Sequence, residues 1–186
     1  YQISRFEGSP NVEVRVDQFT RVAHIGFNCL SEPFDDVRVR QAMNYAVDKE
    51  ALVTGILTGL GEPAHSVFAP ATWGYSAVGK YPHDPEKAKA LLADAGYPNG
   101  FKAKLQTPQG RYFMDRETAV AFQAQMAEVG IDLEIETVDW ATYLQILRYP
   151  PETNETQVYL LGWESGTADF QLPAENIFHS SSWAPK

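Results

Sequence analysis

Arg111, Tyr112 and Trp163 are the side chains of this 186-residue sequence whose types and settings best suit the binding of a small solute. A guanidinium can hold a carboxylate through two parallel charge-assisted hydrogen bonds, and an indole offers a large rigid face with one N–H donor. Other roles stay open for both residues. Arg111 would also fit as a solvated loop residue or as a partner of Asp115 or Glu117, and Trp163 would also fit as a plug of the core.

Signatures of catalysis are mostly missing. The sequence has no G-x-S-x-G elbow, no Walker P-loop and no H-E-x-x-H motif. Its four histidines are scattered, with none at the i, i+4 spacing that puts two metal ligands on one helix face. We therefore expect a protein that is not an enzyme, with no catalytic residue, no metal site and no cofactor. The alternative is a small serine hydrolase built on Ser165, with His179 as the nearest histidine in the sequence.

Composition bounds the class of protein. Apolar residues make up 44% of the chain, which is enough for a packed core. The formal charge is −9 and there is no run of lysine or arginine, so we expect no nucleic-acid partner. Cys29 is the only cysteine, which excludes an intrachain disulfide.

Apolar periodicity predicts an α/β domain in which helices alternate with strands. Alternating apolar residues predict strands at 11–17, 22–28, 102–107 and 131–136, and the apolar run 158–161 predicts a central strand buried on both faces. A 3.6-residue period predicts helices at 36–47, 49–60, 85–95, 115–129 and 140–147. Their expected N-caps are Asp35 or Asp36, Asp48, Asp84, Asp115 and Asp139, and a long ordered loop is expected at 62–82.

Several motifs, in a fixed order, resemble solute-binding protein family 5, the extracytoplasmic receptors of peptide, nickel and glutathione ABC importers. They are PFDDVRVRQAMNYAVDKEALV at 33–53, WGY at 73–75, YPHDPEKAKALLADAGYPNGF at 81–101, QMAEVGI at 125–131 and GW at 162–163. The resemblance covers nearly the whole chain.

This resemblance implies that residues 1–186 form a single α/β domain, a lobe like those of type II periplasmic binding proteins, with helices packed on the faces of a mixed β-sheet. Such receptors have two lobes that close over the ligand, and these residues correspond to the C-terminal lobe. The implied protein is periplasmic, is secreted through a signal sequence outside these residues, and works with a missing N-terminal lobe and with ABC permease subunits of the inner membrane. A sensor that uses the same fold without transport stays open.

The resemblance also implies roles for individual residues. Arg111 takes the place of an arginine that pairs with the C-terminal carboxylate of a peptide-like solute, and Trp163 packs on the solute with Tyr112 beside it. Peptide-binding relatives carry an aspartate three residues after that tryptophan, where this chain has a glycine. Thr167 and Asp169 are expected to replace the lost contact, although Asp169 would serve equally well as a helix cap.

Overall fold

Four strands form one mixed β-sheet in the computed structural model, which describes residues 3–6, 9–77, 79, 81–149, 154–171 and 174–179. The order across the sheet is β1-β4-β2-β3, and β2 runs parallel to both of its neighbours whereas β1 runs antiparallel to β4. The strands are β1 (Val22–Phe27), β2 (Lys102–Pro108), β3 (Asp132–Val138) and β4 (Val158–Trp163). The predicted mixed sheet and the central position of the 158–161 run are confirmed.

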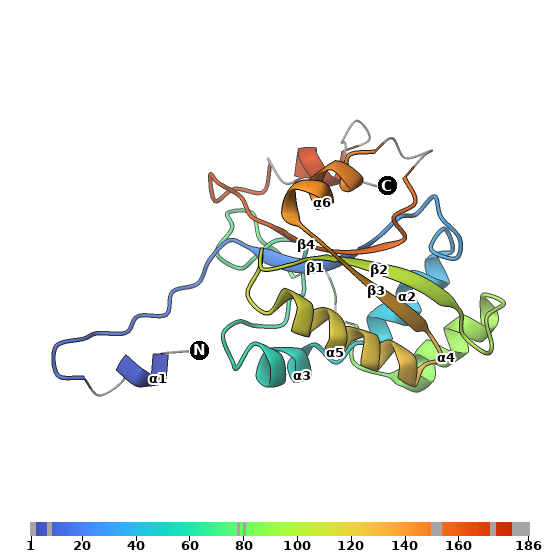
Figure 1. Cartoon of the computed structure of the whole chain (residues 1–186), viewed down its shortest axis with the longest axis horizontal. Helices are drawn as coiled ribbons and strands as arrows, with labels where there is room; N and C mark the ends of the chain where they lie inside the picture. The colour runs from blue at the N-terminus through green and yellow to red at the C-terminus, as the bar shows by residue number, and fades with distance from the viewer. Residues whose placement is uncertain are drawn as a thin grey trace.

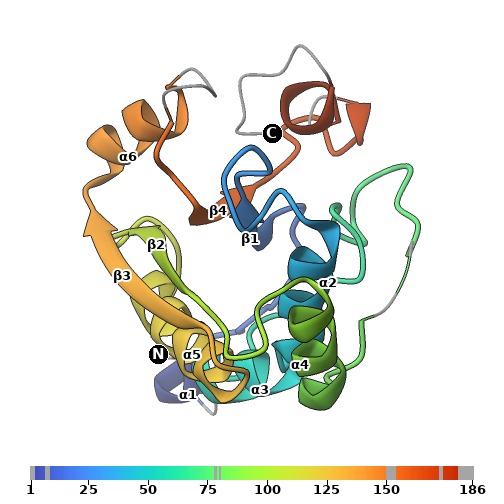
Figure 2. The ribbon, with the colours of Figure 1, turned by 90° about the vertical axis from the view of Figure 1, so that its right-hand side faces the viewer.

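Helices cover both faces of the sheet (Figures 1 and 2). One face carries α2 (Val37–Ala46), α3 (Lys49–Ala51) with the π-helical turn η1 (Leu52–Ile56), α4 (Pro85–Asp94) and α5 (Asp115–Glu128). The opposite face carries α6 (Trp140–Leu147) and the π-helical turn η2 (Ala174–Phe178), while α1 (Ile3–Phe6) lies at the far end of an extended arm. None of the helices in the described ranges is long and apolar enough to cross a membrane.

Strand β4 contributes to two apolar clusters, which explains its unbroken hydrophobic sequence. Val158 belongs to the large apolar cluster on the face of the sheet that α2, α4 and α5 cover. Tyr159 and Leu161 point the other way, into a smaller cluster with Tyr143 and Leu147 of α6. Alternate residues of a strand face opposite sides, so a strand that is covered on both sides needs apolar residues at successive positions.

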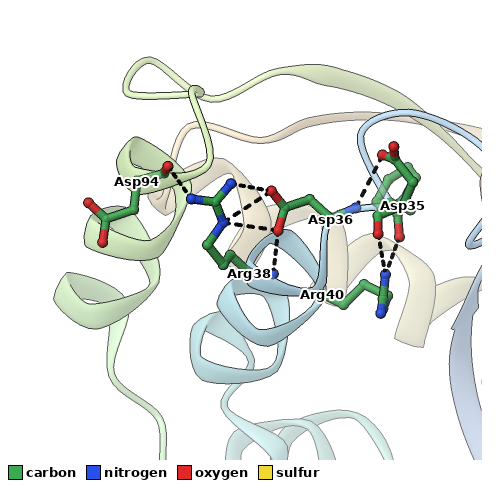
Figure 3. Close-up of polar contacts among 6 residues, drawn as sticks. Asp35, Asp36, Arg38, Arg40 and Asp94 are labelled. Atoms are coloured by element: carbon green, nitrogen blue, oxygen red, sulfur yellow. Dashed lines mark hydrogen bonds and ion pairs between the residues drawn. The ribbon is translucent and has the colours of Figure 1, made fainter.

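The start of α2 is fixed by a set of charged side chains (Figure 3). The Asp36 carboxylate accepts from the backbone N–H of Arg38 at 2.7 Å and from its guanidinium, and these hydrogen bonds hold the pKa of Asp36 below its usual value. Arg38 also donates to the carbonyl of Asp94 at the end of α4, and Arg40 donates to the carbonyl of Phe34 before α2. The contact between Arg38 and Asp94 joins α2 to α4.

The predicted strand at 11–17 is wrong. This segment is extended but pairs with no strand of the described chain, and it runs away from the domain (Figure 1). Val12, Val14 and Val16 are 48%, 36% and 70% exposed. Alternation makes a strand possible, but a ladder needs a partner strand to take its backbone hydrogen bonds.

One helix prediction needs correction as well. The segment predicted as a helix at 49–60 is helical only as far as Ile56, and Thr58 follows with a φ of 53°. Its cap, Asp48, is confirmed, since the carboxylate accepts from the N–H of Ala51 at 2.9 Å. The predicted loop at 62–82 contains no helix or longer strand where it is described, only the single bridge between Trp73 and Asp169.

Candidate ligand-binding groove

The loop after β2 is held by a buried carboxylate. Asp115 was predicted to cap α5, but the cap position is Met114, which makes no side-chain capping bond. Asp115 instead reaches back, so that one carboxylate oxygen accepts from the N–H groups of Arg111 and Tyr112 at 2.8 and 3.1 Å. The other oxygen accepts from the N–H of Arg116 at 2.8 Å. Asp115 therefore binds the backbone of Arg111 and fixes where the two loop side chains begin.

Tyr112 lies across the end of β4 because residue 162 is a glycine. The phenol donates to the carbonyl of Gly162 at 3.1 Å. A Cβ at position 162 would lie only 2.6 Å from the Cε1 atom of the Tyr112 ring. Burial raises the pKa of Tyr112 above its usual value, which favours the protonated phenol that donates this hydrogen bond.

Aromatic rings hold the guanidinium of Arg111. Its Cζ atom lies 4.8 Å from the centre of the Trp140 ring and 5.5 Å from the centre of the Tyr112 ring, and the two rings meet edge to face. Trp140 is the first residue of α6, whose start is fixed by Asp139 accepting from the N–H of Thr142 at 3.1 Å. A guanidinium against aromatic faces keeps its edge N–H groups available for an anion.

These side chains line one groove of about 360 Å³ at the carboxyl edge of β2 and β4. The structure brings together Arg111, Tyr112 and Trp163, which the sequence analysis singled out as binding residues. Trp163 is half-buried, and it both packs against the small apolar cluster and lines the groove. The apolar part of the described lining consists of Tyr112, Trp140, Leu144, Leu161, Gly162 and Trp163. The charged or polar part consists of Arg21, Arg111, Arg148, Glu164 and Asn176.

Thr167 and Asp169 lie outside this described lining. The Thr167 hydroxyl donates to the Asp169 carboxylate at 2.6 Å, and the other Asp169 oxygen accepts from the N–H of Gln171 at 2.9 Å. The second contact is of the kind that the cap interpretation of Asp169 requires. A role for these two residues in ligand binding stays a prediction.

Ser165 supports the same turn. Its side chain is buried, and its hydroxyl accepts from the N–H of Asp169 at 3.1 Å and lies 3.3 Å from the Thr167 hydroxyl. These contacts stabilise the loop after β4, a structural role that needs no nucleophile. Within the part of the chain that the structure describes, no three His, Cys, Asp or Glu side chains gather to hold a metal ion.

Eight residues of the described lining were not predicted from the sequence, and five of them show why. Trp140, Leu144 and Arg148 follow one another at spacings of four, so a helix starting at 140 puts them on one face. That pattern was available in the sequence. Arg21 and Glu164 were not predictable in the same way, because they become neighbours only when Val22 pairs with Trp163 across β1 and β4.

Comparison with known proteins gives a consistent result. A family described as bacterial extracellular solute-binding proteins, family 5 Middle, matches residues 1–185. The chain is 34% identical over 176 residues to heme-binding protein A of Haemophilus influenzae, which covers 90% of this chain and 30% of that protein. It is also 34% identical over 171 residues to the dipeptide-binding protein of Escherichia coli K12, covering 90% of this chain and 31% of that protein.

A solved structure agrees with the fold as well. HbpA2 from Haemophilus parasuis superimposes with a TM-score of 0.84 at 31% identity, covering 94% of this chain and 34% of that one. The chain thus spans about a third of the length of the proteins it matches.

Proposed function

Because this chain belongs to family 5 of the bacterial extracellular solute-binding proteins, we propose that it forms the C-terminal lobe of a two-lobed, periplasmic receptor for a peptide-like solute. An N-terminal lobe of the same polypeptide supplies the other wall of the binding site. The receptor delivers its solute to ABC permease subunits in the inner membrane. The dipeptide-binding relative supports this class of solute, and the length that the chain leaves uncovered in its relatives supports the second lobe.

One observation carries the proposal: the Arg111 guanidinium, held between the Trp140 and Tyr112 rings, lines the same groove as Trp163. A peptide ends in a carboxylate, which the guanidinium can bind with charge-assisted hydrogen bonds. The adjacent rings offer apolar faces for side chains or the peptide plane. Because the groove is open toward solvent, a second surface is needed to exclude water and to strengthen these contacts.

Closure of the two lobes supplies that second surface. A ligand that touches both lobes binds the closed state better than the open one and shifts the population toward it, and the permease can then recognise the closed state. One lobe makes only part of these contacts. We therefore expect this lobe alone to bind peptides weakly or undetectably.

The test uses the full-length receptor with a panel of dipeptides, measured by thermal shift and calorimetry. A ligand that binds only the native state raises the melting temperature. Arg111→Ala should reduce affinity about 10- to 100-fold, the effect of one charge-assisted interaction, with little change in the melting temperature of the ligand-free protein.

Arg116→Ala is the matched control, because Arg116 is exposed on α5 and only its backbone contacts Asp115. It should bind peptides like the wild type. Unchanged peptide affinity in Arg111→Ala contradicts the proposed site, and micromolar affinity of the isolated lobe contradicts the proposed need for a second one.

A further inference from the structure

A second arginine lies at the same groove, and it is paired with an acid. Arg21 immediately precedes β1 and Glu164 immediately follows β4, and the cross-strand pair Val22–Trp163 brings them together. Their ion pair spans 2.5 Å between the Arg21 Nη2 and Glu164 Oε2 atoms. Both side chains line the groove and remain partly exposed, Arg21 at 35% and Glu164 at 39%.

The ring of Tyr112 has both guanidinium groups close to it. The Cζ atom of Arg21 lies 5.9 Å from the ring centre and that of Arg111 lies 5.5 Å from it. The chain as a whole is acidic, with a formal charge of −9, so two cations beside one ring are a local exception. A groove of this kind concentrates anions against the net charge of the protein.

We propose that Arg21 is a second carboxylate-binding group, so that the groove prefers peptide-like solutes with two carboxylates, and that Glu164 is a built-in counterion displaced by the second carboxylate. The inference rests on the proposed function, which assigns the first carboxylate to Arg111. A carboxylate of the solute offers Arg21 the same charge as Glu164 does, so one ion pair replaces another, and the pair being replaced has no hydrogen bond at Glu164 Oε2 in the described structure. Glu164, already partly exposed, then turns to solvent.

The exchange is feasible because the existing pair is weak. Ion pairs between partly exposed side chains contribute little, since water and salt screen them and both side chains lose rotational freedom. A solute that is already anchored at Arg111 competes as an intramolecular partner, at a high effective concentration. The guanidinium of Arg21 stays charged in proteins, so Arg21 still favours an anionic partner when Glu164 is displaced.

The test compares two dipeptides of nearly equal shape, Ala-Glu and Ala-Gln, which differ by one carboxylate. Calorimetry on the full-length wild-type receptor should show tighter binding of Ala-Glu by roughly tenfold. Arg21→Gln should remove this preference by weakening Ala-Glu about tenfold more than Ala-Gln. Glu164→Gln should strengthen Ala-Glu relative to Ala-Gln by roughly three- to fivefold, because the competing carboxylate is gone.

Lys89→Gln is the control for a lost positive charge, because Lys89 forms a similar exposed pair with Glu86 on α4, across the sheet from the groove. It should alter neither affinity. Arg111→Ala should weaken both dipeptides, so failure of the proposed function is seen separately from failure of this inference.

Three results overturn the inference. Equal weakening of both dipeptides by Arg21→Gln means that Arg21 only supports Tyr112. Weakening of both by Glu164→Gln means that Glu164 accepts the ammonium group of the peptide. A wild-type receptor that binds both dipeptides with no preference for Ala-Glu has no second carboxylate site of the proposed kind, whereas one that binds neither contradicts the proposed function on which this inference rests.

Discussion

Gly162 is the position where a single methyl group tests the geometry of the groove most directly. An ideal Cβ at this residue would lie 2.6 Å from Cε1 of Tyr112 and 3.1 Å from both Cδ1 and Cζ. In Gly162→Ala the ring must retreat by roughly 1 Å to reach ordinary contact. That movement stretches the 3.1 Å hydrogen bond from the phenol to the carbonyl of residue 162 and shifts the surface on which Arg21 and Arg111 lie.

The size of the effect follows from three terms. Overpacking costs about 1–3 kcal/mol. Loss of the phenol hydrogen bond adds about 0.5–1.5 kcal/mol. Alanine recovers about 0.5–1 kcal/mol, because glycine loses more conformational freedom in a strand. Together these terms lower the free energy of unfolding of Gly162→Ala by about 0.5–4 kcal/mol, and we expect peptide binding to weaken about tenfold or more.

The assay is urea unfolding followed by circular dichroism, with calorimetry for peptide affinity, both on the full-length protein. Gly166→Ala is the matched control, because a Cβ at that residue meets nothing within 4 Å. In a Tyr112→Ala background the cost of Gly162→Ala should disappear, since the obstructing ring is gone. The reasoning is refuted when Gly162→Ala is as stable as Gly166→Ala, or when its cost persists without the Tyr112 ring.

Two further perturbations test how β4 is held. Tyr143→Phe should lower the free energy of unfolding by about 1–3 kcal/mol in urea denaturation. The buried phenol of Tyr143 donates to the carbonyl of Leu160 at 2.6 Å, and the substitution removes that donor. A loss below ~0.5 kcal/mol contradicts this prediction. Burial lowers the pKa of His24 in β1, so the unfolded chain binds a proton more readily than the folded one, and stability should fall as the pH drops below the unfolded value of about 6.5. Urea midpoints at about pH 7.5 and pH 5.5 should differ by less in His24→Gln than in the wild type, and an equal difference removes His24 as the cause.

Helix positions were largely predictable because their signals are local. The caps Asp84 and Asp139 each accept from a backbone N–H three residues ahead, as their sequence context predicts. Asp115 has the same context and behaves differently, since its carboxylate accepts from the N–H groups of residues 111 and 112 behind it. The sequence shows that an aspartate can accept a hydrogen bond at this position. The path of the preceding loop decides which backbone N–H donates it.

Strands were predictable only where the chain provides a partner. The run 158–161 is apolar because β4 is covered on both faces, and it forms the predicted interior strand. Residues 11–17 alternate as cleanly, yet they form no strand in the described structure. Side-chain alternation is a property of the sequence, whereas the hydrogen bonds of a ladder belong to two segments at once.

The sequence by itself determined the α/β alternation and most helix starts, and it singled out Arg111, Tyr112 and Trp163 as candidate binding side chains. These depend on residue type and on hydrogen bonds between near neighbours in the chain. Only the tertiary structure decided that Tyr112 meets residue 162 and that Arg21 meets Glu164, because both contacts require β4 to lie between β1 and β2. The order of strands is set by the packing of the whole core, so no short stretch of sequence contains it.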